Sequence, residues 1–243
     1  MREINKDKLI AKIYSGRPEL GAAAAEILTA KISELLKTKE YINIIFASAP
    51  SQNEFLAELL NKNIEWNRIN AFHMDEYIGL HPDASQGFGN FLKDRLFTKV
   101  NCHEVNYLNG NATDPQDECK RYSDLLINYP TDIVCLGIGE NTHLAFNDPL
   151  IVKVVDLDQD CRFQQVNDGC FATIDDVPTH ALTITMPALF KSTFAYAIVP
   201  GKFKANAIYH TLNSDISELY PSTILRRHNH AVLFIDEDSA SKL

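Results

Sequence analysis

Two adjacent acids close an apolar run in the first third of the sequence. The segment is Phe72-His73-Met74-Asp75-Glu76-Tyr77. A carboxylate that is shielded from water has a raised pKa and can serve as a general base. An isolated Asp-Glu pair is also common in helix caps and surface turns, so the segment alone supports both interpretations.

A second segment carries a histidine just after an apolar run and two glycines. It reads GIGENTHLAFNDP over residues 137–149. The glycines let the backbone turn tightly. His143 then lies between polar groups, with Asn141 before it and Asp148 five residues on, and an imidazole held by such partners can shuttle a proton. A purely structural histidine is the alternative. A dinucleotide-binding fingerprint is excluded because its third glycine would fall at Thr142.

A third segment joins an apolar run at 41–47 to a helix predicted to open at Ser51. The connecting residues are Ala47-Ser48-Ala49-Pro50-Ser51-Gln52, and Ser51 with Glu54 fits a capping box. Free N–H groups and the helix dipole make such a junction an anion site. An ordinary turn with a capping serine is the alternative.

The elements that must position these residues alternate between strands and helices. Strand-like runs, including 41–47, recur at 68–74, 104–108, 131–138, 181–186, 194–199 and 231–235, and helical stretches at 17–37, 84–97, 115–128 and 202–212. This alternation predicts an α/β fold of three layers, Rossmann-like, with a mostly parallel sheet and helices on both faces. We expect a single domain over residues 1–243, a loose SASKL tail, and ligands at the carboxyl ends of the strands.

Composition excludes several classes of partner. The chain has 243 residues and a formal net charge of −9, so its surface does not attract nucleic acid or an anionic membrane. No apolar run approaches the roughly 20 residues of a membrane span, and the N-terminus lacks a signal-peptide core. The five cysteines show no metal-ligand spacing, which favours reduced thiols. We therefore expect a cytoplasmic protein.

Three motifs in order resemble the glucosamine-6-phosphate deaminase family. They are MDEYIGL at 74–80, LNGNA at 108–112 and GIGENTHLAFNDP at 137–149. The similarity continues through VPTHALT at 177–183 and PGKFKA at 200–205, so it covers most of the chain.

The resemblance implies an enzyme that opens an amino-sugar ring, moves a proton between C2 and C1, and releases ammonia. It implies no metal or organic cofactor. The substrate would be a small phosphorylated amino sugar, either glucosamine 6-phosphate or galactosamine 6-phosphate. Such enzymes include monomers and larger assemblies, so a homo-oligomer is compatible with it.

The resemblance also assigns roles to individual residues. Asp75 matches the base for the C2 proton, and His143 matches the ring-opening acid/base. Lys204 matches a phosphate ligand, and the loop at 47–52 matches the phosphate cradle. The remaining expected substrate or phosphate contacts are Ser48, Ser51, Gln52, Glu76 and Gly139.

The sequence departs from the family around the histidine. Asn141 stands where the family usually has Asp, Thr142 where it has Gly, and Asp148 where it has Glu. Asn141 and Asp148 are the expected orienting partners of His143. An amide accepts a hydrogen bond but does not offset an imidazolium charge; the corresponding Asp-to-Asn change in a serine protease costs about 10⁴ in kcat. Ring opening is therefore the step most affected.

The phosphate cradle departs as well. The loop is poorer in Gly and Thr than in the family, and Pro50 removes one backbone donor. The family's phosphate-binding arginine has no clean match. Arg162 is the nearest cation in sequence and our candidate substitute, with a structural or surface arginine as the alternative.

Two further functions remain open. Phosphogluconolactonases share the fold and a similar glycine–histidine motif, so a 6-phosphogluconolactonase-like hydrolase is one alternative. The segments LAFNDP and MDEY favour the deaminase instead. A non-catalytic sugar-phosphate-binding paralogue is the other alternative, because of Asn141.

Overall fold

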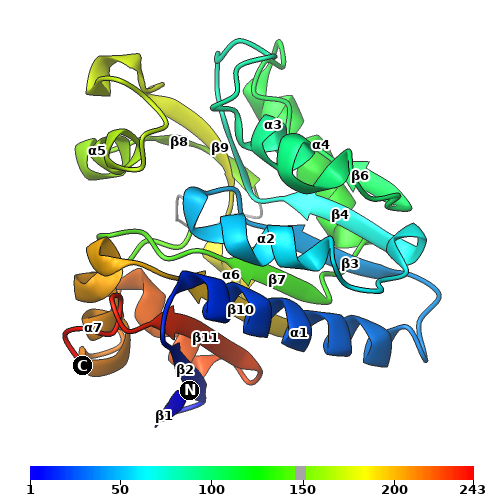
Figure 1. Cartoon of the computed structure of the whole chain (residues 1–243). Coiled ribbons are helices and arrows are strands. Elements are labelled where there is room, and N and C mark those ends of the chain that lie inside the picture. Colours follow the sequence, from blue (N-terminus) through cyan, green and yellow to red (C-terminus); the bar gives the residue numbers. More distant parts are fainter. Residues whose placement is uncertain (146–151) are drawn as a thin grey trace.

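A large sheet of eight strands forms the centre of the protein, in the order β1-β2-β11-β10-β7-β3-β4-β6 (Figure 1). The computed structural model describes residues 1–145 and 152–243. Only β1 and β2 pair antiparallel; every other neighbouring pair is parallel. The strands are β1 Arg2–Lys6, β2 Leu9–Tyr14, β3 Ile42–Phe46, β4 Ile69–His73, β6 Glu104–Asn106, β7 Ile133–Leu136, β10 Phe194–Val199 and β11 Ala231–Asp236.

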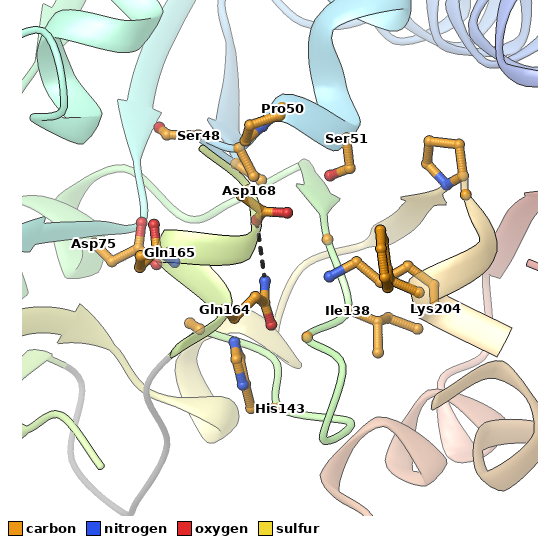
Figure 2. A pocket seen from close by; sticks show the side chains of 18 of the residues that line it. Ser48, Pro50, Ser51, Asp75, Ile138, His143, Gln164, Gln165, Asp168 and Lys204 are labelled. Carbon is orange, nitrogen blue, oxygen red and sulfur yellow. Dashed lines mark hydrogen bonds between the residues drawn. The ribbon is translucent and has the colours of Figure 1, made fainter. Parts of the chain in front are cut away.

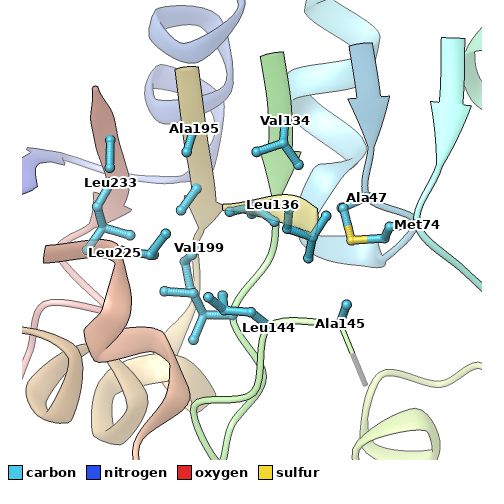
Figure 3. Close-up of a cluster of buried hydrophobic side chains, with 14 of the residues drawn as sticks. Ala47, Met74, Val134, Leu136, Leu144, Ala145, Ala195, Val199, Leu225 and Leu233 are labelled. Carbon is cyan, nitrogen blue, oxygen red and sulfur yellow. The ribbon is translucent and has the colours of Figure 1, made fainter. Parts of the chain in front are cut away.

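Helices cover both faces of this sheet, because side chains alternate between the two faces along each strand. In β3, Ile44 packs with the cluster that contains helices α1 (Arg17–Leu35), α2 (Asn53–Leu59) and α3 (Phe88–Leu92). Ile45 packs on the opposite face, with α4 (Pro115–Asn128) and α7 (Ala205–Asn213). Figure 3 shows part of this second cluster. The three-layer prediction is confirmed.

A smaller antiparallel sheet stands apart from the large one (Figure 1). It contains β5 (Asp75–Tyr77), β9 (His180–Ile184) and β8 (Val152–Asp156), and α5 (Gln159–Asn167) follows β8. The expected strand at 181–186 exists as β9, but its place in the parallel sheet was wrong. Apolar periodicity identifies a strand and does not identify its partners. Strands β1 and β2 and helix α5 were not predicted.

Two local predictions were also wrong. Ser51 lies inside a 3₁₀ turn, η1 (Pro50–Gln52), and no side chain caps this turn or α2. Glu54 instead accepts from Arg17 Nε at 2.8 Å, which removes it from the expected capping box. The C-terminal residues are not loose, since Ser239 is fully buried and its N–H donates to Asp236 at 2.9 Å.

Two expectations about the chain as a whole can be compared with the structure. All five cysteines are free. Within the described ranges, no helix is long and apolar enough to cross a membrane.

Candidate active site

A cavity of about 150 Å³ lies at the carboxyl ends of four neighbouring strands, β4, β3, β7 and β10. After β3 the chain continues to β4, which lies beside β3 on one side. After β7 it passes through the small sheet and returns as β10, which lies on the opposite side of the β3–β7 pair. Ligands bind at such a switch point in open α/β sheets. The lining includes Arg17, Ser48, Ser51, Asp75, Gly139, His143, Gln164, Gln165, Asp168, Phe203 and Lys204 (Figure 2).

Asp75 enters this cavity because β4 ends at His73 and a new strand, β5, begins at Asp75. Burial and then the neighbouring charge of Glu76 raise the pKa of Asp75 to about 8. Its carboxylate is therefore a stronger base than an ordinary aspartate, although less of it is ionised at neutral pH.

Glu76 faces away from the cavity, because successive side chains of a strand point to opposite sides. It accepts hydrogen bonds from the N–H groups of Phe88 at 3.0 Å and Gly89 at 2.8 Å, at the first turn of α3. Burial opposes ionisation of this carboxyl, but His73 and the two N–H groups outweigh it and lower the pKa of Glu76. The expectation that Glu76 contacts substrate is not supported, since it is absent from the cavity lining and anchors α3 instead.

The LNGNA motif contacts the backbone at the end of β5. A Cβ atom on Gly110 would lie 1.8 Å from the carbonyl oxygen of Tyr77, and Gly79 N–H donates to Gly110 O at 3.0 Å. Only glycine allows this close approach between the two backbones.

His143 is held by Asn141. The imidazole Nδ1 lies 2.5 Å from Asn141 Oδ1, and the backbone N–H of His143 donates to the same atom at 3.3 Å. Because that atom accepts from the backbone, it is the amide oxygen, so Nδ1 carries the ring proton and Nε2 is the basic nitrogen. Cys161 Sγ lies 3.5 Å from Nδ1.

Burial is the main influence on the charge of His143, and it favours the neutral form. Burial and then the Lys204 charge lower the pKa of His143 to about 4, and Asp158 opposes this shift. Asp148, the other expected partner, lies outside the described residues.

Gly139 provides the surface against which the imidazole rests. A Cβ atom here would lie 2.2 Å from His143 Cε1 and 2.5 Å from Nε2. The turn is closed by Gly139 N–H donating to His143 O and Thr142 N–H donating to Gly139 O, both at 2.9 Å. Gly139 also lines the cavity, so its predicted contact with substrate is sterically allowed.

Hydroxyl groups and a buried lysine also line the cavity. Within the described residues, the buried Ser48 hydroxyl has no hydrogen-bond partner. Ser51 Oγ accepts from Gln52 Nε2 at 3.0 Å, which leaves its own proton for a ligand. Lys204 is only 7 % exposed and extends into the cavity from η5 (Lys202–Lys204) (Figure 2). Burial lowers the pKa of Lys204, against the charges of Asp168 and Glu140.

Gln52 does not line the cavity. It is fully buried, and its amide donates to Ser51 Oγ and to Ile198 O at 3.1 Å. Its amide therefore positions the loop that carries Ser51.

Arg162 lies away from the cavity and Arg17 lies on it. The Arg162 guanidinium donates to the carbonyl oxygens of Ile174 at 2.6 Å and Val177 at 3.1 Å, which is the structural alternative stated for it. Arg17 donates to Glu54 and to Pro50 O, each at 2.8 Å, and holds the 47–52 loop. The sequence held one indication of the role of Arg17. A cation in the first turn of a helix is unfavourable with the helix dipole, so a contact outside the helix is expected to offset this cost.

Helix α5 and the residue after it supply cavity residues that the sequence did not indicate. These are Gln164, Gln165 and Asp168. Gln164 Oε1 accepts from Glu140 N–H at 2.9 Å, which ties α5 to the loop after β7. Across the two described ranges, no group of three His, Cys, Asp or Glu side chains is arranged to hold a metal ion.

Comparisons with known proteins identify the family of the chain. Residues 16–234 match the family described as glucosamine-6-phosphate isomerases/6-phosphogluconolactonase. A glucosamine-6-phosphate deaminase of Bacillus cereus strain B4264 is 32% identical over 215 residues, covering 86% of this chain and 81% of that protein. The corresponding protein of strain G9842 is 32% identical over 222 residues, covering 89% and 84%.

Solved structures show the same fold. A monomeric glucosamine-6-phosphate deaminase superposes with a TM-score of 0.88 at 30% identity, covering 96% of this chain and 99% of that one. The 6-phosphogluconolactonase of Thermotoga maritima gives 0.77 at 20% identity, covering 94% and 100%. By sequence and by fold, the chain belongs to the glucosamine-6-phosphate isomerase/6-phosphogluconolactonase family.

Proposed function

We propose that this protein is an amino-sugar-phosphate isomerase/deaminase, converting glucosamine 6-phosphate or galactosamine 6-phosphate to the ketose 6-phosphate and ammonia. One observation carries the proposal: Asp75 and His143 line the same cavity as Lys204 and Ser48. Isomerisation of a sugar phosphate needs a base that removes a proton from carbon, an acid/base that acts on oxygen, and hydrogen-bond donors for the phosphate.

In this proposal, ring opening belongs to His143. Its neutral imidazole, with Nδ1–H bonded to Asn141 Oδ1, accepts the anomeric hydroxyl proton at Nε2 and returns a proton to the ring oxygen. At position 141 the transient imidazolium meets an amide dipole, where an aspartate would supply a negative charge. We therefore expect ring opening to be slower here than with an aspartate at position 141.

Proton transfer between carbons belongs to Asp75. The ionised carboxylate removes the C2 proton of the open-chain aldehyde while the ammonium group of the substrate gives a proton to O1, and an enolamine forms. The carboxyl group then returns its proton to C1, which leaves a protonated imine at C2. Water then adds to the resulting C2 imine, and ammonia leaves as the ketose forms. A carboxylate with a raised pKa suits the abstraction of a proton from carbon.

The phosphate would lie at the opposite end of the cavity. Lys204 supplies a buried cation there, and Ser48 and Ser51 supply hydroxyl donors. Arg17 holds the loop that carries both serines.

The test is to incubate the protein with each of the two amino-sugar phosphates, and to measure ammonia and ketose phosphate together. Equal amounts of both products from one sugar support the proposal and identify the epimer. The Asp75→Asn protein, purified identically, controls for a contaminating deaminase.

Two other results would refute the proposal. Consumption of 6-phosphogluconolactone without ammonia release from either amino sugar would identify a hydrolase. Binding of a sugar phosphate without turnover of any of these compounds would identify a binding paralogue.

A further inference from the structure

Asp168 places a carboxylate at the end of the cavity where the phosphate is proposed to bind. It follows the last turn of α5, and its side chain points into the cavity that Ser51 and Lys204 also line (Figure 2). The one hydrogen bond of its side chain within the described residues is long, 3.4 Å from Gln164 Nε2. An acid at a helix C-terminus is unfavourable with the helix dipole, so its position is not explained by the stability of α5.

The charges at this end of the cavity nearly cancel. Arg17 and Lys204 are the cations among the described lining residues. Arg17 is already paired with Glu54, through two nitrogen–oxygen contacts of 2.8 Å. Lys204 is then opposed by Asp168, so a ligand meets roughly no net positive charge.

We propose that Asp168 is a specificity-determining residue that makes this end of the cavity discriminate against a doubly charged phosphate and favour a singly charged one. This inference rests on the proposed function, which assigns the phosphate to this end. A carboxylate and a dianion within a shared cavity repel each other, whereas a monoanion retains a proton that it can donate to the carboxylate.

Several ionisable groups face Asp168 from the elements around it. Its charge acts on Arg17 of α1, Lys204 of η5, Glu140 after β7, Tyr77 of β5 and Cys170. These groups, and also Asp75 and His143, are common to the parent protein and to a variant at position 168. A difference in pH dependence between the two proteins therefore reports on Asp168.

The first experiment measures binding of inorganic phosphate and of glucose 6-phosphate, which has no amine to release, by calorimetry. The parent is compared with Asp168→Asn at pH 5.5 and pH 8, on either side of the second pKa of the phosphate group, which is about 6 for a monoester. Asp160→Asn removes the same charge from an exposed position on the same helix and serves as the matched control.

We expect Asp168→Asn to bind both ligands about tenfold more tightly than the parent at pH 8, with a difference below about threefold at pH 5.5. Asp160→Asn should match the parent at both pH values. Unchanged or weaker binding by Asp168→Asn at pH 8 would overturn the proposal, as would equal tightening at both pH values or an absence of binding in both proteins.

A second measurement needs no variant. Glucose 6-sulfate keeps a single charge at both pH values, so the parent should bind it more tightly than glucose 6-phosphate at pH 8. The opposite preference would overturn the proposal. These experiments measure binding alone, so their failure is distinct from failure of the deaminase proposal, which is judged by ammonia release.

Discussion

Among single residues, the two groups proposed to move protons have opposite pKa shifts. Burial raises the pKa of Asp75 to about 8 and lowers the pKa of His143 to about 4, because it disfavours the charged form of each. Asp75 therefore gains basicity by burial, and His143 is held neutral. The two residues suit different steps for this reason.

Asp75→Asn should abolish proton exchange at C2, with a loss of at least about 10³-fold, because an amide cannot accept the proton. In the parent, activity should rise with pH toward a midpoint near 8, as the carboxyl ionises. Exchange of the C2 hydrogen with deuterated water, followed by NMR, measures both. A variant that exchanges at the parent rate would remove Asp75 as the base.

Asn141→Asp should raise the pKa of His143 by about 1–3 units, because a carboxylate at hydrogen-bond distance stabilises the imidazolium. NMR titration of the His143 ring signal, assigned with His143→Gln, measures the shift. An unchanged pKa would mean that the residue at position 141 does not control the charge of His143.

Among the elements, the turn after β7 determines where the imidazole lies. Gly139 leaves the space that the ring occupies, and Thr142 adopts a φ of 75°, in the left-handed region. A β-branched residue is strained there, and the Thr142 hydroxyl is buried with no hydrogen-bond partner in the described part of the chain. Gly139 therefore suits its position in the turn, whereas Thr142 is strained at its own.

Gly139→Ala should reduce activity at least about 100-fold and leave the melting temperature within a few degrees, because the new methyl group displaces the imidazole. Gly16→Ala is the matched control, since its Cβ would meet nothing closer than 3.9 Å. Parent-like activity in Gly139→Ala would show that the ring can move without affecting catalysis.

Thr142→Gly should stabilise the protein by about 1–2 kcal/mol, through relief of backbone strain and removal of the unpaired hydroxyl. Thermal unfolding measures this change. The greater freedom of glycine in the unfolded chain opposes it, and a lower melting temperature would show that this cost is the larger one.

For the whole molecule, stability should depend on pH through Asp75. Its folded pKa lies above its unfolded value of about 3.9, so the folded state binds the extra proton between these values. The stability of the folded state therefore falls as pH rises from about 4 to 8. Asp75→Asn removes this dependence.

The Asp75→Asn protein should melt several degrees above the parent at pH 8, with the difference shrinking toward pH 4. Melting curves of both proteins across this range test the expectation. A constant difference would attribute the effect to something other than ionisation of Asp75.

The sequence by itself determined the three layers and the motifs that meet at one end of the sheet. Apolar runs identify buried strands wherever they pair, and carboxyl ends of parallel strands converge, so Asp75 and His143 could be brought together in advance, whereas Lys204 came only from the family resemblance. Ser48 followed from the same reasoning as Asp75 and His143.

Only the tertiary structure decided which polar neighbours face the cavity. Asp75 and Glu76 are adjacent in sequence, yet strand alternation directs one into the cavity and the other to α3. The two arginines differ in the same way. Arg162 donates to backbone carbonyl groups away from the cavity, whereas Arg17 of the first helix donates to the 47–52 loop. Asp168 follows a helix whose sequence has no apolar periodicity, so the helix was not predicted. Its contact with the cavity depends on packing between distant segments, which local sequence patterns do not encode.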